Sequence, residues 1–191
     1  MTSVLDPVLT RSDIPARYRR TPIGLLLEYH NLGRSFERYD RAQLLIGMCM
    51  DNRKHMTIPD NFAFIIRAGG ANMRYSEFKL SFAIAIGGVR HLALIGHTHC
   101  GMTNLASRKE DFVRGLVKNA GWSTREAEGH FQASAPLYEI GEVAPFILSE
   151  AERLRRRYPK VTVAPMLYKV EDNRLYLLRD KKSSRSGRKA H

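Results

Sequence analysis

Two short segments of the chain hold the residue types that could do chemistry. They are residues 49–53 (CMDNR) and residues 96–101 (GHTHCG), and they contain both cysteines of the chain, Cys49 and Cys100. Each segment follows a short apolar run that is typical of a β-strand. Two thiolates and one imidazole form a three-ligand zinc set, which leaves the fourth tetrahedral position for water. Zinc with an open position makes hydroxide available near neutral pH, so the pattern indicates catalytic metal chemistry.

The two cysteines have a plainer alternative role as buried structural thiols, because free cysteine packs like a small hydrophobic residue. Their neighbours favour metal binding instead. His97 stands three residues before Cys100, and Asp51 and Arg53 follow Cys49. Zinc (Zn2+) is the expected ion, because sets of thiolate and imidazole favour it. Two cysteines cannot form a disulfide framework, and in a reducing cytoplasm they stay free to bind metal.

His97 and His99 compete for the place of the third ligand. Alternation in an extended segment points both to the same side, so alternation alone does not choose between them. The spacing from His97 to Cys100 lets both residues reach one ion across a turn, whereas His99 is adjacent to Cys100 and would have to fold back sharply. We therefore expect His97 to be the ligand and His99 to have a packing or hydrogen-bonding role.

Asp51 and Arg53 stand two residues apart, just beyond a predicted ligand. An exposed surface ion pair is the alternative reading, and such a pair contributes little to stability. Beside a metal-bound water the same pair has a catalytic use. Arginine can hold a carboxylate in bidentate fashion and keep it ionised, and the carboxylate can then accept a hydrogen bond from the nucleophile and orient it.

A third segment, residues 67–70 (RAGG), lies between the other two. The motif CxDxR from Cys49, then RAGG, then GHxxCG resembles the β-class carbonic anhydrases in both order and spacing. The likeness extends from about residue 40 to about residue 105 and continues more weakly to Leu178. It implies an α/β fold with a mostly parallel sheet flanked by helices. It also implies one zinc ion held by Cys49, His97 and Cys100.

The resemblance further implies roles for the residues around the metal. The family positions that match Asp51 and Arg53 form a dyad beside the zinc ion. Some members also have a closed state, in which the Asp takes the fourth zinc position, and both states stay open for Asp51. Residues 67–72 are either a plain turn or, as the resemblance favours, a loop beside the site. The family assembles as dimers or dimers of dimers, with the N-terminal helix wrapping a partner.

The implied function is reversible hydration of carbon dioxide to bicarbonate and a proton, a lyase reaction. Two departures from the family bear on the substrate. Many plant-type members have a Gln just before the second strand, and residues 58–61 (IPDN) contain none. They also have a Tyr in the helix before the third strand, where this chain has Phe82. Hydrolysis of carbonyl sulfide or carbon disulfide on the same zinc is therefore the alternative enzymatic function.

Two further alternatives stay open. A non-catalytic, zinc-stabilised adaptor with a basic tail would be a protein of another class. Asp51 and Arg53 argue against it, because a purely structural zinc would prefer a fourth protein ligand. His55 is a candidate proton shuttle by residue type, since histidine titrates near neutral pH, although an ordinary surface histidine is the plainer reading.

Buried strands must position these residues. Apolar runs at residues 44–49, 62–66 and 92–95 are typical of strands buried on both faces, and residues 161–164 are a fourth strand. Residues 75–87 are predicted as a helix with Phe78, Phe82 and Ile86 on one side. Helices are also predicted over residues 109–120, 124–134 and 143–157, and a hairpin around residues 171–174. Alternating strands and helices indicate a parallel sheet, which places ligand sites at its carboxyl ends.

The length of 191 residues is sufficient for one domain with a sizeable core, and 43% hydrophobic residues is an ordinary globular value. We expect an N-terminal arm and helix over residues 1–40 that serves oligomerisation and a zinc-binding α/β catalytic domain over residues 41–178. A basic disordered tail is expected over residues 179–191. No apolar run approaches the ~20 residues that cross a bilayer. The N-terminus lacks a secretory pattern, which favours a cytoplasmic location.

The net charge of +12 is unevenly distributed. Residues 179–191 hold six basic residues against Asp180, a net charge of +5, so the rest of the chain carries +7. A block of like charge is typical either of a solvated tail or of an electrostatic contact with nucleic acid, membrane or an acidic partner. We expect the solvated tail, with a small molecule as substrate and nucleic acid an unlikely partner.

Overall fold

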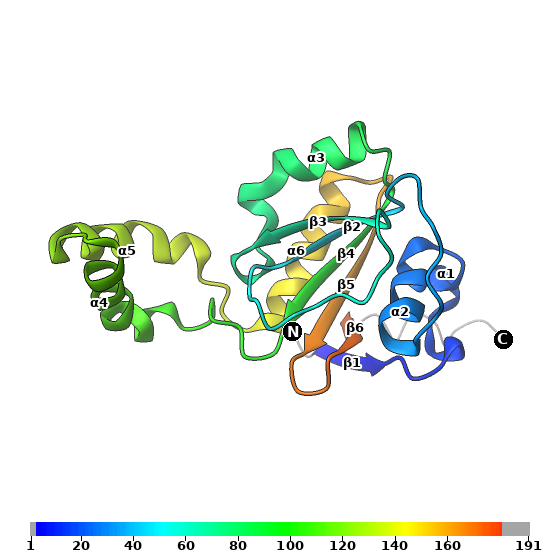
Figure 1. The fold of residues 1–191 in the computed structure, drawn as a ribbon, viewed down its shortest axis with the longest axis horizontal. Coiled ribbons are helices and arrows are strands. Elements are labelled where there is room, and N and C mark those ends of the chain that lie inside the picture. Colours follow the sequence, from blue (N-terminus) through cyan, green and yellow to red (C-terminus); the bar gives the residue numbers. More distant parts are fainter. Residues whose placement is uncertain (1–2, 181–191) are drawn as a thin grey trace.

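The computed structural model describes residues 3–180 of the chain. One six-stranded sheet forms the centre, in the order β1-β6-β5-β4-β2-β3. Its strands are β1 (Ser3–Pro7), β2 (Leu44–Cys49), β3 (Ala63–Ala68), β4 (His91–His97), β5 (Thr162–Lys169) and β6 (Arg174–Asp180). Strands β2 to β5 are parallel, while β6 and β1 are antiparallel at one edge. The predicted mostly parallel α/β fold is confirmed (Figure 1).

The described helices are α1 (Ala16–Arg19), α2 (Pro22–Leu32), α3 (Glu77–Ala85), α4 (Lys109–Ala120), α5 (Thr124–Tyr138) and α6 (Val143–Arg157). The bounds of α4 and α6 match the prediction. The hydroxyl of Ser123 caps α5 by accepting a hydrogen bond from the backbone N–H of Glu126. None of the helices within residues 3–180 is both long enough and apolar enough to cross a bilayer.

Both faces of the sheet are covered, because successive residues of its central strands are apolar and point to opposite sides. In β4, Leu92 and Leu94 belong to the core shared with α3 and α6, whereas Ala93 and Ile95 belong to the core beneath α2. Figure 1 shows these two groups of helices on either side of the strands. The continuous apolar runs of the sequence follow from this double burial.

The second predicted strand differs from the expectation of burial on both faces. β3 lies at the edge of the sheet and pairs only with β2. Its side chains Phe64 and Ile65 are 38% and 44% exposed. An edge strand has no neighbour on one side, and this one also carries its apolar side chains at the surface.

The helix α3 continues this exposed region. Leu80 and Ala83 face the core, so the side formed by Phe78, Phe82 and Ile86 faces outward instead of packing inside. Phe78 is 81% exposed, which is unusual for such a large apolar side chain in a helix. The four-residue spacing correctly identified one apolar side of the helix. The side that faces the sheet, however, is the one that carries Leu80 and Ala83.

The N-terminal 40 residues hold a strand that the sequence pattern did not predict. β1 pairs antiparallel with β6, with Leu5 opposite Leu178. After it, α2 buries Ile23, Leu26 and Leu27 against this chain's own sheet. These side chains pack within the chain, and the contact of this helix with a partner, which the resemblance implied, stays a prediction.

The last strand extends beyond the predicted domain boundary. β6 continues through Asp180, so Arg179 and Asp180 belong to the sheet and not to the predicted tail over residues 179–191. Arg179 forms a two-pronged ion pair with Asp6 of β1, which ties the last strand to the first. The remaining part of the predicted tail, residues 181–191, lies outside the described residues.

The helices α4 and α5 form a hairpin that extends away from the sheet (Figure 1). α4 has no buried residue. The two helices hold each other through contacts such as Phe112 against Phe131, whose ring centroids are 5.2 Å apart. The hairpin therefore depends on its own contacts rather than on the sheet.

The packing of α6 on β4 leads to the first prediction. A Cβ atom added at Gly96 would lie 2.7 Å from side-chain carbons of both Val143 and Ile147, so α6 would have to move. We expect Gly96→Ala to lower the free energy of unfolding by about 1–3 kcal/mol, the usual cost of overpacking a core, in urea unfolding monitored by circular dichroism. Gly115→Ala on α4 is the control, because no atom lies within 4 Å of its added Cβ. Equal stability of both variants would contradict this packing.

Candidate metal centre

The carboxyl ends of β2 and β4 bring the three predicted ligands together. β2 ends at Cys49, its neighbour β4 ends at His97, and Cys100 follows on the next turn. The two sulfur atoms and the imidazole nitrogen lie within 4.8 Å of one another, and all three side chains are buried. From β2 the chain continues to β3, and from β4 it continues to β5. These two strands lie on opposite sides of the β2–β4 pair in the order of the sheet. The cluster therefore lies at the switch point where open α/β sheets place ligand sites.

The imidazole of His97 has one nitrogen that is free to bind a metal ion. Its Nδ1 lies 2.8 Å from the carbonyl oxygen of Thr98, which fixes Nδ1 as the donor. The lone pair therefore falls on Nε2, which is buried and has no hydrogen-bond partner among the described residues. A buried unpaired acceptor is costly, and a metal ion between this nitrogen and the two sulfurs would satisfy it. The donor set thus fits a metal ion.

The two thiols form a coupled pair, with their sulfur atoms 3.9 Å apart. The contact with Cys100 lowers the pKa of Cys49, and the nearby imidazole of His97 lowers it further. The same contact with Cys49, together with burial, raises the pKa of Cys100. Without a cation the pair therefore retains one proton, and a cation bound between the sulfurs would displace it.

His99 lies outside this cluster. Its backbone adopts a positive φ of 53°, and its imidazole Nε2 lies 2.6 Å from a carboxylate oxygen of Glu171. The side chain of His99 is 71% exposed. The structure thus brings His97 to the thiols and gives His99 a hydrogen-bonding contact at the surface.

Arg53 holds Asp51 beside the cluster. The guanidinium Nη2 donates to Oδ2 of Asp51 at 2.7 Å, and Nε donates to Oδ1 at 3.0 Å. These bonds hold the pKa of Asp51 well below its usual range. Oδ2 lies 3.9 Å from Nε2 of His97, so the ionised carboxylate reaches the predicted ligands. The Asp51 side chain is only 18% exposed, which distinguishes this contact from an ordinary surface ion pair.

Two cationic side chains for which the sequence predicted no role donate hydrogen bonds to the loop that carries Asp51. Lys54 is fully buried, and its ammonium group donates to the backbone carbonyl of Asp51 at 3.0 Å. Burial lowers the pKa of Lys54, while the neighbouring Cys49 and Asp51 oppose that shift. Arg67 donates to the carbonyl oxygens of Cys49 and Lys54. A lysine in a polar loop reads as a surface residue, so only the fold could identify Lys54.

The other predicted site residues occupy different places. Gly70 has a positive φ of 62°, and its backbone is among the groups that lower the pKa of Cys49. The loop over residues 67–72 therefore lies next to the site. His55 is exposed in the loop after Lys54. Phe82 is 54% exposed on the outer side of α3.

Solved structures identify the fold. A carbonic anhydrase from Glaciozyma antarctica matches with a TM-score of 0.58 and 24% identity, over 73% of this chain and 84% of that chain. A β-carbonic anhydrase from Trichomonas vaginalis matches with a TM-score of 0.60 and 16% identity, over 76% of this chain and 88% of the other. This chain has the β-carbonic anhydrase fold. The resemblance seen in the sequence motifs is thereby confirmed at the level of structure.

A third solved structure, with a different named activity, broadens the comparison. The apo form of a carbon disulfide hydrolase matches with a TM-score of 0.51 and 18% identity, over 79% of this chain and 85% of that chain. No protein-family profile matches the chain, and no curated protein sequence matches it either. At these identities the comparisons establish the fold, and the chemistry must be argued from the site.

The cluster predicts which side chains retain a metal ion. We expect Cys100→Ser and His97→Ala to lose most of their zinc after dialysis against a chelator, because each removes one of three buried ligand atoms. His99→Ala is the control and should keep about one zinc ion per chain. Elemental analysis of the purified proteins measures this. Full and tight zinc retention by Cys100→Ser would refute the ligand assignment.

Proposed function

We propose that this chain is a zinc-dependent carbonic anhydrase that reversibly hydrates carbon dioxide to bicarbonate and a proton. One observation carries the proposal. An arginine-clamped, ionised carboxylate, Asp51, reaches a buried group of two thiols and one imidazole whose free nitrogen has no other partner. Its fold is the one found in the carbonic anhydrases described above, which supports a lyase of this kind.

Cys49, His97 and Cys100 would hold the zinc ion, since thiolate and imidazole ligands suit zinc better than magnesium or calcium. Three protein ligands leave one position for water or substrate. When bound, zinc supplies Lewis acidity that lets water react as a nucleophile near neutral pH. The coupling of the two thiols means that metal binding releases a proton, so metal affinity rises with pH.

In this proposal Asp51 orients the nucleophile. Its pKa is low enough to keep the carboxylate ionised through the neutral range, so it accepts hydrogen bonds and does not donate them. Arg53 occupies both carboxylate oxygens and also donates to the carbonyl of His99 at 2.9 Å. In this proposal the dyad is in its open state, with Asp51 held by arginine rather than released toward the metal position.

Lys54 and Arg67 act as positioning residues. They donate to backbone carbonyls of the loop that carries Asp51, and so they limit how far that loop can move. The buried ammonium group of Lys54 also lies 3.7 Å from Oδ1 of Asp51. It therefore adds a fixed positive charge beside a site that contains a carboxylate and thiols, which favours their ionised forms.

Hydrolysis of carbon disulfide or carbonyl sulfide is the second candidate. The structural match to a carbon disulfide hydrolase favours it, as does the absence of Gln from residues 58–61. The deciding experiment loads one protein sample with zinc and measures both carbon dioxide hydration and sulfide release from each sulfur substrate. Turnover of none of the three would favour the non-catalytic adaptor instead.

The dyad leads to a prediction about activity. Asp51→Asn should keep its zinc and lose more than about tenfold in kcat/KM, which is about 1.4 kcal/mol of barrier, because an amide cannot form the same ionised pair with Arg53. Stopped-flow hydration of carbon dioxide measures the change. Asp111→Asn is a matched control, since Asp111 forms an exposed ion pair with Arg114 on the projecting helix α4. A loss smaller than tenfold would show that Asp51 is not central.

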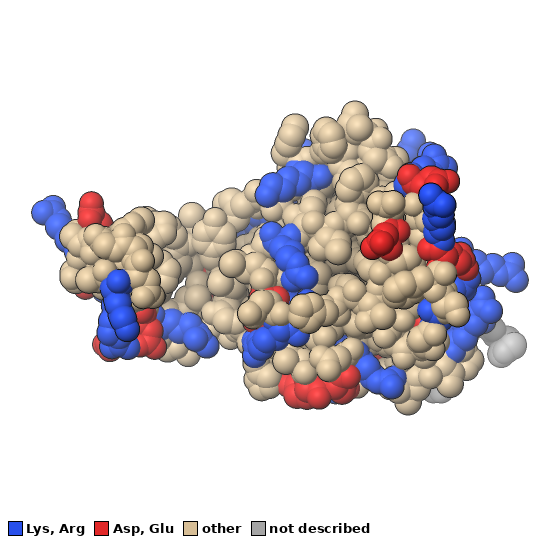
Figure 2. Space-filling view, in the orientation of Figure 1, with Lys and Arg blue, Asp and Glu red and all other residues tan. Residues whose placement is uncertain are grey.

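We also propose that the chain forms a homodimer, and that its contact is the apolar face of β3 and α3. This face is defined by five exposed side chains: Phe64, Tyr75, Phe78, Phe82 and Ile86. In Figure 2 the surface over α3 is largely uncharged. Large exposed apolar patches mark interfaces, and an edge strand offers unpaired backbone groups. A second copy presents the same face, so two copies can cover each other.

The proposed interface can be tested by charge. Phe78→Glu should convert the dimer to a monomer in light scattering coupled to size exclusion, because it places a carboxylate at the most exposed apolar position of the face. Leu9→Glu is the control, since Leu9 is 59% exposed but lies outside the face. A Phe78→Glu chain with unchanged mass would exclude this contact.

The reducing cytoplasm remains the proposed location, where both cysteines would stay reduced.

A further inference from the structure

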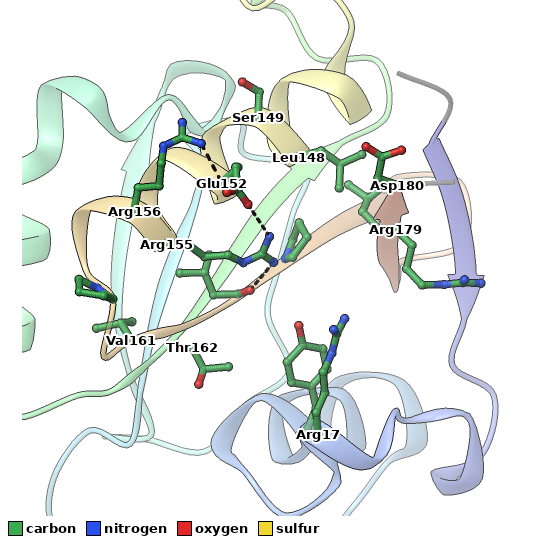
Figure 3. Close-up of a pocket in the computed structure, with 15 residues that line it drawn as sticks. Arg17, Leu148, Ser149, Glu152, Arg155, Arg156, Val161, Thr162, Arg179 and Asp180 are labelled. Carbon is green, nitrogen blue, oxygen red and sulfur yellow. Dashed lines mark hydrogen bonds and ion pairs between the residues drawn. The ribbon is translucent and has the colours of Figure 1, made fainter. Parts of the chain in front are cut away.

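A groove lies where the parallel strands begin, at the end of the sheet opposite the candidate metal centre. It has a volume of about 870 Å³ and is lined by residues of α1, α6 and the adjoining ends of β5 and β6 (Figure 3). Thr162 at the start of β5 pairs with His91 at the start of β4. The groove is therefore a strand length, roughly 20 Å, away from His97 at the other end of β4. It belongs to no part of the proposed catalytic site.

Two arginines of α6 share one carboxylate in this groove. Arg155 and Arg156 lie 3.5 Å and 3.4 Å from the carboxylate oxygens of Glu152, and Arg155 also donates to the carbonyl of Val163 at 2.7 Å. Figure 3 shows this chain of contacts across the groove. One negative charge cannot neutralise two positive charges, so a surplus positive charge remains at the groove.

A third arginine enters from the other side. Arg17 of α1 stacks on the ring of Tyr18 at 4.7 Å and has no carboxylate partner within residues 3–180. In Figure 3 it rises from α1 toward β5. Arg179 also lines the groove, but it points away and is neutralised by Asp6. The available cations are therefore Arg17, Arg155 and Arg156, while Glu152 and Asp180 are the acids among the lining residues.

A second groove extends the basic surface along the same edge. It has a volume of about 720 Å³ and its lining includes Arg90, directly before β4, and Lys160, two residues before β5. Val161 lines both grooves, so they adjoin. Neither Arg90 nor Lys160 has a carboxylate partner in the described part of the chain. The amino ends of the central strands thus carry cations where the carboxyl ends carry the metal ligands.

The sequence has further positive charge directly after Asp180, the last described residue. β6 runs antiparallel to β5 and ends at Asp180, which lines the first groove. The eleven residues that follow contain five basic residues and no acid: Lys181, Lys182, Arg185, Arg188 and Lys189. Much of the surplus charge of the chain therefore belongs to one edge of the fold or to the segment that begins there.

We propose that this edge binds the phosphate backbone of a nucleic acid without reading its sequence. Guanidinium groups match phosphate in bidentate geometry, and a row of cations matches a row of phosphates. The lining residues include no exposed aromatic ring on which a base could stack, and Tyr18 is only 3% exposed. Contacts to the backbone alone fix position but carry no sequence information.

A lipid bilayer fits this edge less well. The surface is concave, and none of the exposed large apolar side chains of residues 3–180 is among the residues that line either groove. Membrane-binding surfaces combine basic residues with apolar side chains that enter the lipid. Inorganic polyphosphate has the same repeating phosphate chemistry as nucleic acid, so the experiment includes it as a separate arm.

The test uses the full chain loaded with zinc and a fluorescein-labelled single-stranded 20-mer, with binding followed by anisotropy at several salt concentrations. We expect the double variant Arg17→Gln/Arg156→Gln to bind at least about tenfold more weakly at 0.1 M salt and to reduce the slope of log K against log salt by about 1.4, since each lost phosphate contact removes about 0.7. The matched control is Lys118→Gln/Arg125→Gln, which removes two exposed cations from α4 and α5. Its affinity should stay within about twofold of the parent chain.

Further arms separate the possible ligands. A 20-mer of unrelated sequence should bind equally well, and carbon dioxide hydration by the groove variant should match that of the parent chain. Binding of fluorescein-labelled polyphosphate without binding of the 20-mer would assign the site to inorganic polyphosphate and overturn the proposal. Equal losses in the groove and control variants would overturn the proposal. So would binding to phosphatidylserine vesicles without binding to the 20-mer, or a loss confined to Lys181→Gln/Lys182→Gln.

Discussion

The parallel pairing of β2 with β4 is the constraint on which the candidate metal centre depends. The register sets Met48 opposite Ile95, so the two strands end beside each other. Cys49 and His97 then emerge at the same edge, and the turn after β4 returns Cys100 to them. A shift of one residue in either strand would turn the side chains of that strand to the opposite face and separate sulfur from imidazole. The apolar residues that bury β2 and β4 on both sides prevent such a shift, so the core also determines the chemistry.

Much of the site could be predicted because its residues are close in sequence to the ends of apolar strands. Cys49, His97 and Cys100 stand at such ends, and parallel strands bring their carboxyl ends together. Asp51 and Arg53 contact each other at a separation of two residues, which local spacing can suggest. Lys54 could not be found this way, since its burial depends on how the loop folds beneath Arg67. Whether a strand lies at the edge of the sheet also depends on residues far away in the sequence. The apolar run of β3 therefore predicted a strand buried on both faces, although β3 has no neighbouring strand on one side.

The two ends of the sheet have opposite chemical character. Soft ligands and a partly buried carboxylate gather where the parallel strands end, and arginines and a lysine gather where they begin. Such a separation allows two functions to coexist, because charges a strand length apart in aqueous salt are largely screened from each other. The apolar face of β3 and α3 occupies a third region. Each region can therefore be altered by substitution with little direct effect on the other two.

The pairing of β1 with β6 has a consequence for how the chain is made. Asp6 and Arg179 are 173 residues apart, yet they are joined across neighbouring strands. During synthesis the first strand emerges before any of the others, while its only partner in the sheet is the last. The parallel core from β2 to β5 can assemble while β1 waits unpaired. Closure of this edge is a contact of very high sequence separation, which is the kind that slows folding. Of the strands in this sheet, β1 is thus the first to be synthesised and among the last to find its place.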